Sequence, residues 1–270
     1  MADTYNGLSL NSDFETQVRA ATVFAAHESS MFLGGQVIPV VNAPNGLVKI
    51  PVVSGGTAWT LSTEAASSAA DVDVAAVTTS GSVDIVCDLI AARTVVRDLG
   101  AIDANEIGRQ LGNKVSGAFD ATVATAMASL TAHSEDVATT IDLDDIYEAI
   151  GLIRGTGEMG PLFGFVSANK YSQLMNAIGS TAFAGGDWQG AALQSGNLGS
   201  IAGVQFFVTS YLTSACAIFG QDAMRIAMQK NVDVEVARRA EAVGNDIVAN
   251  LHAKVAVVDA NRGRYINLAS

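Results

Sequence analysis

The sequence predicts an α+β fold, in which helices and strands lie in separate parts of the chain. Residues 104–130 carry apolar side chains at a spacing close to four, which is the pattern of one long helix. From residue 201 onward the chain instead consists of short β-rich segments separated by Gly, Asn and Asp. Because helical and strand patterns do not alternate strictly, an α+β architecture is favoured over a doubly wound parallel sheet.

Length and composition limit the classes of protein to which the chain can belong. Its 270 residues suffice for a sizeable buried core, in one large domain or two smaller ones. Apolar residues make up 49% and charged residues 16%, a combination that excludes a disordered chain. Fifteen Lys and Arg against 27 Asp and Glu give a net charge of −12, so sequence-specific DNA binding is not expected.

The N-terminal part is predicted to contain a helix followed by two strands. Ser12 and Glu15 have the spacing of a capping box, and apolar residues follow at helical spacing up to a Gly-Gly pair, which predicts a helix over residues 13–32. Two apolar β-type runs, residues 36–41 and 47–53, flank the turn-forming sequence Asn-Ala-Pro-Asn-Gly. This order favours a hairpin-like reversal.

Residues 54–82 are predicted to form a long two-stranded excursion. The segment is rich in Ser, Thr, Gly and Ala, has no basic residue, and contains one aromatic residue, Trp59. An isolated two-stranded ribbon is only marginally stable in water unless it packs on another element. We therefore expect the excursion to pack against another chain, with Trp59 and Leu61 near its tip buried there.

Paired acids mark the starts of two helices. Asp103 with Glu106 has the spacing of an N-cap and its N3 partner, and predicts the start of the long helix. Asp142 with Asp145 repeats this spacing and predicts a shorter helix that ends by residue 155. Both starts lie directly before apolar runs with helical periodicity.

The C-terminal half is predicted to be mostly β-structure. A strand over residues 162–166 is expected to lead, through Ser167 as N-cap, into a short helix that ends at Gly179. The later strand segments are residues 201–208, 215–219, 232–236, 247–258 and 265–268.

No constellation of residues predicts catalysis, a cofactor or a metal ion. Residues 155–160 match the G-x-G-x-x-G spacing, but a helix precedes them and a strand follows, which is the wrong order for a dinucleotide site. His27, His133 and His252 lack ligand spacing, and the acids at 142–148 suit the first turns of a helix. We therefore predict that the protein is not an enzyme.

Cysteines and apolar stretches give no sign of export or of a membrane span. Cys87 and Cys216 are expected to be free thiols, and the N-terminus lacks the pattern of a signal peptide. Residues 188–221 carry no charge, yet their repeated Gln, Gly and Ser exclude a spanning helix. Residues 171–221 contain Asp187 as their only charge, which suits the centre of a protein interface.

The elements occur in a particular order: an N-terminal helix, a β excursion, a helix of about 40 Å, an α/β middle and returning strands. This order resembles the major capsid proteins of tailed double-stranded DNA bacteriophages, which have the Hong Kong 97-type shell fold, and the resemblance covers essentially the whole chain. The residues that carry it most are 199–204 followed by 206–210, and the closing strands over 232–236, 245–258 and 264–268.

The resemblance implies a Hong Kong 97-like capsid fold with an N-terminal arm, an extended β-hairpin called the E-loop, a long spine helix, and peripheral and axial domains. The implied ranges are 1–35 for the N-terminal arm, 36–92 for the E-loop and its stem, 93–136 and 229–259 for the peripheral domain, and 137–228 and 260–270 for the axial domain. No scaffolding segment is expected before the arm. The excursion tip has no lysine, so a covalent cross-link between subunits is not expected.

The resemblance also implies a structural subunit that self-assembles into hexameric and pentameric capsomers of an icosahedral phage head. Its expected partners are further copies of the chain, scaffolding and portal proteins, and enclosed double-stranded DNA held without sequence-specific contact, with no membrane. Such a protein is made in the host cytoplasm and resides in the virion capsid. The alternatives are an encapsulin-type compartment, a surface adhesin, which should carry an export signal, and a hydrolase, which should present a nucleophile with a base.

The distribution of charge predicts which surfaces of two copies meet. Residues 1–92 hold nine acids and two bases, net −7, whereas residues 93–270 hold eighteen acids and thirteen bases, net −5. The acids Glu64, Asp71, Asp73 and Asp84 are therefore expected to pair with arginines of a neighbouring copy. The alternative is that they are solvated surface charges. The candidate arginines are Arg93, Arg97, Arg109, Arg238, Arg239, Arg262 and Arg264.

Overall fold

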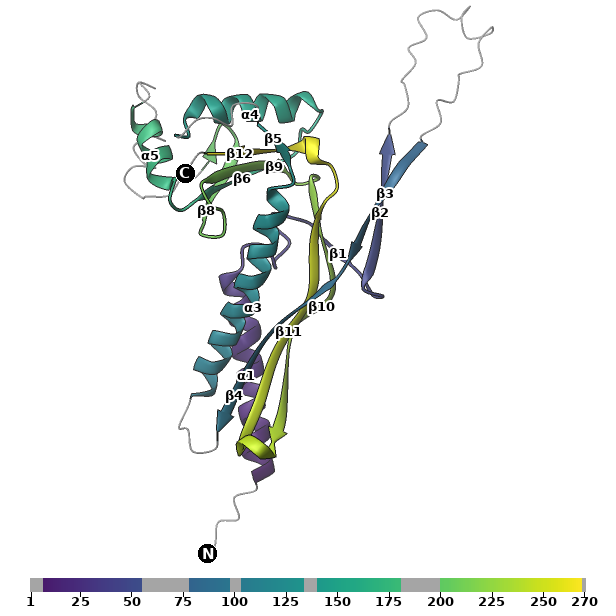
Figure 1. Cartoon of the computed structure of the whole chain (residues 1–270), viewed down its shortest axis with the longest axis vertical. Coiled ribbons are helices and arrows are strands. Elements are labelled where there is room, and N and C mark those ends of the chain that lie inside the picture. Colours follow the sequence, from purple (N-terminus) through teal and green to yellow (C-terminus); the bar gives the residue numbers. More distant parts are fainter. Residues whose placement is uncertain (1–6, 55–77, 98–102, 134–139, 181–199, 269–270) are drawn as a thin grey trace, which may run out of the picture.

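The computed structural model describes residues 7–54, 78–97, 103–133, 140–180 and 200–268. Helices and strands segregate as expected, which confirms the α+β class. Figure 1 shows two long helices beside a tall sheet, with a second sheet and two shorter helices at one end. The helices are α1 (Gly7–Ser29), α3 (Ala104–Met127), α4 (Leu143–Gly155) and α5 (Tyr171–Ser180).

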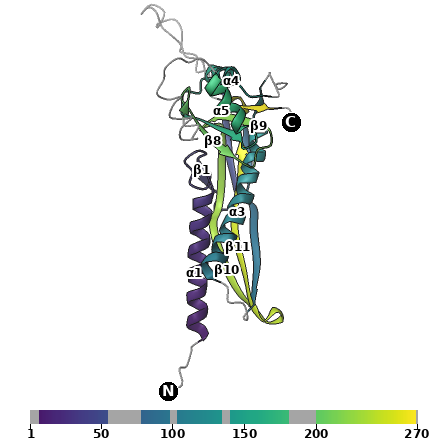
Figure 2. The same ribbon diagram turned by 90° about the vertical axis from the view of Figure 1, so that its left-hand side faces the viewer.

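The tall sheet has four strands in the order β1-β10-β11-β4. Its strands are β1 (Val40–Asn42), β10 (Met224–Arg239), β11 (Gly244–Val257) and β4 (Asp88–Arg97). The long strands β10 and β11 form an antiparallel hairpin, β4 pairs antiparallel with β11, and β1 pairs parallel with β10. Helix α3 packs on β11 and β4, and α1 packs on α3 and β10, so both helices cover the same face (Figures 1 and 2).

The second sheet has six strands in the order β5-β12-β9-β6-β8-β7. Its strands are β5 (Thr131–Ala132), β12 (Gly263–Asn267), β9 (Ala215–Gly220), β6 (Leu162–Ser167), β8 (Val204–Thr209) and β7 (Ser200–Ile201). The central strands β6 and β9 are buried along their whole length. Helix α4 packs against β9 and β12, so this sheet is covered by a helix of its own (Figure 1).

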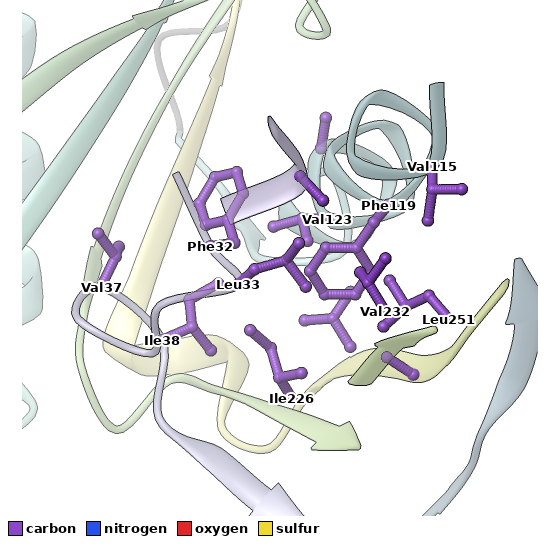
Figure 3. Packing of buried hydrophobic residues seen from close by; sticks show 14 of the residues in the cluster. Phe32, Leu33, Val37, Ile38, Val115, Phe119, Val123, Ile226, Val232 and Leu251 are labelled. Carbon is purple, nitrogen blue, oxygen red and sulfur yellow. The ribbon is translucent and has the colours of Figure 1, made fainter. Parts of the chain in front are cut away.

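One hydrophobic core joins the two sheets. Figure 3 shows Phe119 of α3 and Phe32, from the segment after α1, among apolar side chains that include Ile226 and Leu251 of the tall sheet. The same cluster includes Phe165 of β6. The ring of Phe165 lies 5.1 Å from that of Phe32, and it also stacks on two phenylalanines of its own sheet. The end of α1 is thereby fixed against both sheets.

Two predicted helix starts are confirmed with their caps. The Asp103 side chain accepts a hydrogen bond from the Asn105 N–H at the start of α3, whereas Glu106 binds neighbouring side chains on the helix surface. At α4, Asp142 and Asp145 form a complete reciprocal capping box. The long helix ends at Met127, three residues before its predicted end at 130.

Three local predictions are wrong. Helix α1 begins at Gly7 and ends at Ser29, so Ser12 lies within the helix and is not its N-cap. Strands β1 and β2 (Leu47–Ser54) do not form a hairpin, because β1 pairs with β10 and β2 pairs with β3 (Thr78–Val86). Ser167 is the last residue of β6, and its hydroxyl accepts a hydrogen bond from the Ala215 N–H of the neighbouring strand, so it does not cap α5.

The division into arm, E-loop, peripheral and axial domains stays a prediction. Strand β10 begins at Met224, so the proposed boundary at residue 228 lies inside a strand of the tall sheet. The shared core around Phe165 also crosses the proposed division between the two domains.

Candidate assembly surfaces

A two-stranded ribbon projects from the body of the molecule. Strands β2 (Leu47–Ser54) and β3 (Thr78–Val86) pair antiparallel and form a sheet of their own. Figure 1 shows this ribbon leaving the body beside the tall sheet. At its base Ile85 is buried against Ala227 of β10, whereas the cross-strand pair of Leu47 and Val86 is 41% and 56% exposed. The described part of the excursion is therefore two-stranded, as predicted, and it packs on the body through Ile85, with Val48, Ile50 and Val83 beside it.

The prediction that Asp84 needs a cation on another copy is wrong. Its carboxylate lies 3.1 Å from the Lys49 ammonium, on the adjacent strand of the same ribbon. The hydrogen bond from Lys49, with a second from Ser82, lowers the pKa of Asp84. Asp84 therefore has its counter-ion within the chain.

Five predicted interface residues lie outside the described residues. These are Trp59, Leu61, Glu64, Asp71 and Asp73, all in the segment between β2 and β3. Their roles stay predictions.

Two of the predicted arginines are paired on the outer surface of their own chain. Arg93 of β4 binds Asp246 of β11 through two of its nitrogens, which lowers the pKa of Asp246 and raises that of Arg93. Arg109 lies 3.0 Å from Glu106, one turn earlier on α3. Both guanidinium groups are more than half exposed, at 54% and 64%, and surface ion pairs stabilise a fold by about 0 to 1 kcal/mol. The two guanidinium groups therefore remain accessible to a second carboxylate.

The remaining arginines gather at the two ends of the long hairpin. Arg239 lies 3.7 Å from Glu241 beside the hairpin tip, and Arg97 lies nearby on β4, opposite Gly244. Arg97 makes no ion pair with any residue in the described ranges, whereas Arg238 has an interaction within the chain. At the other end, Arg264 donates to the backbone carbonyls of Asn261 and Gly263.

Arg262 belongs to a network that the sequence did not reveal. Its guanidinium lies 3.1 Å from Glu158, which is 95% buried, and 3.2 Å from Asp259. The other oxygen of Glu158 accepts a hydrogen bond from the Gly160 N–H. Burying a carboxylate is costly unless it is paired and hydrogen-bonded, and both conditions are met here. Arg262 thus ties the α4–β6 turn to the final strands.

A groove between helix and sheet was likewise not foreseen. It has a volume of about 510 Å³ and lies between the second half of α3 and strands β4 and β11. Its walls include Ala126, Ile90 and Val255, and the ion pair of Asp88 with Lys254 spans 3.2 Å at its border. This surface is concave and mainly apolar in character.

Asp120 fixes the segment after α1 to α3. Its carboxylate accepts a 2.6 Å hydrogen bond from the Ser30 hydroxyl, and the side chain is buried among apolar neighbours. Burial raises the pKa of Asp120 to about 6, although hydrogen bonds from Ser30 and the Met31 backbone oppose the rise. Asp120 lies on the helix face that the apolar pattern assigns to the core, so the sequence did not reveal that this carboxylate binds Ser30.

Replacing Asp120 by Asn is expected to remove a pH dependence of stability. The pKa in the folded state, about 6, exceeds the ordinary 3.8, so the folded state binds the proton more tightly and stability rises as pH falls between these values. We expect wild-type protein to be more stable at pH 5 than at pH 7 by on the order of 1 to 2 kcal/mol, measured by urea unfolding. Asp120→Asn should lose this difference, whereas the exposed control Asp144→Asn should keep it. The same pH difference in Asp120→Asn as in wild type would contradict the assignment.

The histidines and cysteines occupy separate places. His133 is buried, neither of its ring nitrogens is hydrogen-bonded to a described residue, and its Nε2 lies 3.9 Å from Glu148. Cys216 is completely buried, which raises its pKa to about 12, and Cys87 donates weakly to the Ala227 carbonyl. In the part of the chain that the structure describes, no three His, Cys, Asp or Glu side chains are placed to share a metal ion. None of the described helices has the length and apolar character needed to cross a bilayer.

Comparison with known proteins reveals similarity in structure rather than in sequence. No protein-family model matches the sequence, and no curated protein is significantly similar to it. The subunit of a virus-like particle from Pyrococcus furiosus superposes with a TM-score of 0.64 at 10% identity, over 94% of this chain and 99% of its own. A chain of Mycobacterium phage Che8 superposes with a TM-score of 0.62 at 17% sequence identity, over 83% of this chain and 85% of its own. The capsid protein of cyanophage P-SCSP1u superposes with a TM-score of 0.65 at 12% identity, over 89% of this chain and 88% of its own.

These neighbours define the class of fold. The chain has the α+β architecture of shell-forming subunits, over nearly its whole length. More narrowly, it has the Hong Kong 97-like capsid fold, as predicted.

Proposed function

We propose that this protein is the major capsid protein of a tailed bacteriophage, a structural subunit that self-assembles into a closed shell. The observation that carries the proposal is the full-length agreement of its fold with subunits of phage capsids and of a virus-like particle. The ribbon of β2 and β3 supports it, because a two-stranded sheet that exposes apolar side chains such as Leu47 and Val86 needs a further surface to cover it. A neighbouring copy in a shell supplies that surface.

The shell is an icosahedral head built from hexameric and pentameric capsomers around double-stranded DNA. The net charge of −12 suits an enclosure that holds the genome without sequence-specific contact. Scaffolding and portal proteins are the other proposed partners, and the finished subunit resides in the virion after synthesis in the host cytoplasm. The role is structural, with no catalytic residue assigned.

A protein nanocompartment of the encapsulin type is the second candidate. The particle subunit from Pyrococcus furiosus matches over 99% of its length, which makes a shell that is not a phage head compatible with the same fold. The two candidates differ in their contents, since a phage head encloses DNA and a compartment encloses protein cargo.

Electron microscopy of the purified chain tests the proposal. Closed particles, tubes or capsomer rings in negative stain are the expected result, and nuclease-protected DNA in particles isolated from infected or induced cells supports the phage head. Protein cargo without DNA would select the nanocompartment. A monodisperse monomer across all salt and protein concentrations would overturn both.

Replacing Trp59 by Ala is expected to weaken particles and leave the subunit folded. In our proposal Trp59 and Leu61 are buried on an adjacent copy, and burying one aromatic side chain contributes about 2 to 3 kcal/mol per contact. Thermal dissociation of particles, followed by light scattering, measures the effect. Urea unfolding of the isolated subunit serves as the control and should not change. Particles that form and dissociate as wild type does would remove Trp59 from the interface.

The acidic excursion supplies the second part of the proposed contact. Glu64, Asp71 and Asp73 remain the acids proposed to pair across copies, since Asp84 is already paired. Among the arginines, Arg97 is the best-placed receiver, because it is exposed and forms no ion pair within the described ranges. Arg262 is the least suited, because it holds the buried Glu158.

A further inference from the structure

Helix α1 presents two faces of different character. One face packs on α3 and buries small residues such as Val18, Thr22 and Ala25. The opposite face exposes four residues at spacings of three, four and three, namely Gln17, Ala20, Phe24 and His27. Phe24 is 68% exposed, the second-largest exposed fraction among the large apolar side chains described.

The spacing of the exposed face is that of a coiled-coil seam. A repeat of three and four residues keeps one stripe facing a partner helix along its length. Figure 2 shows α1 along one margin of the molecule, with the tall sheet and α3 on its other side. The His27 Nε2 atom lies 3.3 Å from the Asn231 side-chain nitrogen of β10, at the flank of this face. The seam, which we define as Gln17, Ala20, Phe24 and His27, is therefore left uncovered by the described part of the chain and can receive a helix from outside.

We propose that this seam packs against the same seam of a second copy, with the two α1 helices antiparallel. A two-fold axis beside residue 22 places Phe24 of each helix over Ala20 of the other. The small alanine side chain leaves room for the phenyl ring. The same register sets Gln17 opposite His27, so that polar side chains meet each other and apolar side chains meet each other.

Charges beside the seam favour a second copy over an unrelated partner. In this register the exposed Glu28 lies level with the uncharged Thr16 of the other helix, so no like charges meet across the axis. The nearest cation on the helix, Arg19, is turned toward β10, where it donates to the Val234 carbonyl and lies 3.7 Å from Asp233. The surface is thus complementary to itself in size and polarity, and the register brings no like charges together.

This contact rests on the proposed function. The paired helices meet in four layers of side chains, and only two of these layers pair Phe with Ala. The area that this contact buries is far less than the roughly 1,200 Å² of a stable interface. We therefore expect the helices to pair only where other contacts of a shell hold two copies together. Pairing across a two-fold axis would then link subunits of adjacent capsomers.

Disulfide trapping in assembled particles tests the register. In a Cys87→Ser background, Gln17→Cys and His27→Cys subunits are prepared separately and assembled either alone or mixed. Mild oxidation of mixed particles should give a disulfide dimer, because the two positions face each other. Particles of either variant alone should give none, since like positions lie about 15 Å apart along the axis, beyond the roughly 7 Å limit for a disulfide.

Two further results decide the proposal. Phe24→Ala should lower the temperature at which particles dissociate, whereas Met159→Ala, which removes an apolar side chain that is 79% exposed after α4, should not. Particles that form normally without a mixed disulfide, or that are unaffected by Phe24→Ala, overturn the helix pairing and leave the shell function intact. If wild-type protein forms no assembly, the proposed function fails and the pairing fails with it.

Discussion

Replacing Phe165 by Ala is expected to lower the stability of the isolated subunit by about 3 to 5 kcal/mol, the usual cost of deleting a fully buried phenyl ring. Phe165 has no exposed surface and lies within 5.1 to 5.7 Å of the rings of Phe32, Phe207 and Phe219. Since Phe32 follows α1 and the other two lie in the six-stranded sheet, the vacancy opens where the two sheets and the segment after α1 meet. The expected fall in melting temperature is roughly 6 to 20 °C.

Phe165→Leu is the matched variant for this prediction. It keeps most of the apolar volume but loses the ring contacts, so we expect a smaller loss of about 1 to 2 kcal/mol. Circular dichroism during heating and urea unfolding measure both variants. A melting temperature within 2 °C of wild type for Phe165→Ala, on the order of half a kcal/mol by the same scaling, would show that Phe165 does not join the sheets.

Replacing Gly108 and Gly112 together by Ala is expected to separate α1 from α3. A Cβ atom at Gly112 would lie 2.5 Å from the Thr22 carbonyl oxygen, and one at Gly108 would lie 2.7 Å from the Val18 carbonyl oxygen. The clashing atoms belong to the backbone of α1, so they cannot move without displacing the helix. Each site should cost about 1 to 3 kcal/mol, more than the roughly 0.5 to 1 kcal/mol that Ala gains over Gly in a helix.

The double variant Gly151→Ala and Gly155→Ala is the control for the glycine prediction. These positions lie in α4, and an added Cβ would meet no atom within 4 Å at either. The same chemical change should therefore stabilise the protein slightly, by up to about 1 kcal/mol per site. Opposite signs in urea unfolding are expected for the two pairs, together with faster proteolysis of α1 in the first. Equal effects would contradict close packing of α1 on α3.

Local signals in the sequence were sufficient for most elements. The start of α3 at Asp103 and the capping box at Asp142 were predictable because an N-cap satisfies backbone N–H groups with a side chain a few residues away. A two-stranded excursion was predictable from composition and alternation, although residues 47–53 of β2 were expected to pair with residues 36–41 rather than with β3. The start of α1 was not, because Ser12 lies within a helix whose stability comes from packing on α3 rather than from its cap.

Pairing partners required the tertiary structure. The runs that form β1 and β2 are separated by a good turn sequence, yet β1 pairs with β10, which lies almost two hundred residues away. Ser167 has the side chain of a common N-cap residue, yet its hydroxyl oxygen accepts a hydrogen bond from the Ala215 N–H of an adjacent strand. Asp84 and Arg262 were predicted to pair with another copy, yet each has an ion-pair partner in its own chain. Asp84 pairs with Lys49, and Arg262 pairs with Glu158. A polar side chain pairs with the partner that the fold places within reach. Sequence spacing indicates only those partners that lie a few residues away in the chain.

The sequence by itself determined the α+β class, the order of the elements and the resemblance to phage shell subunits, because periodicity and capping are local properties of the chain. Only the tertiary structure decided which charges are already paired, that one core joins both sheets through Phe165, and that the outer face of α1 stays uncovered by the described residues. These features depend on long-range packing. Many pairs of residues could form a contact as far as their local sequence is concerned, and the packing of distant segments decides which pairs actually meet.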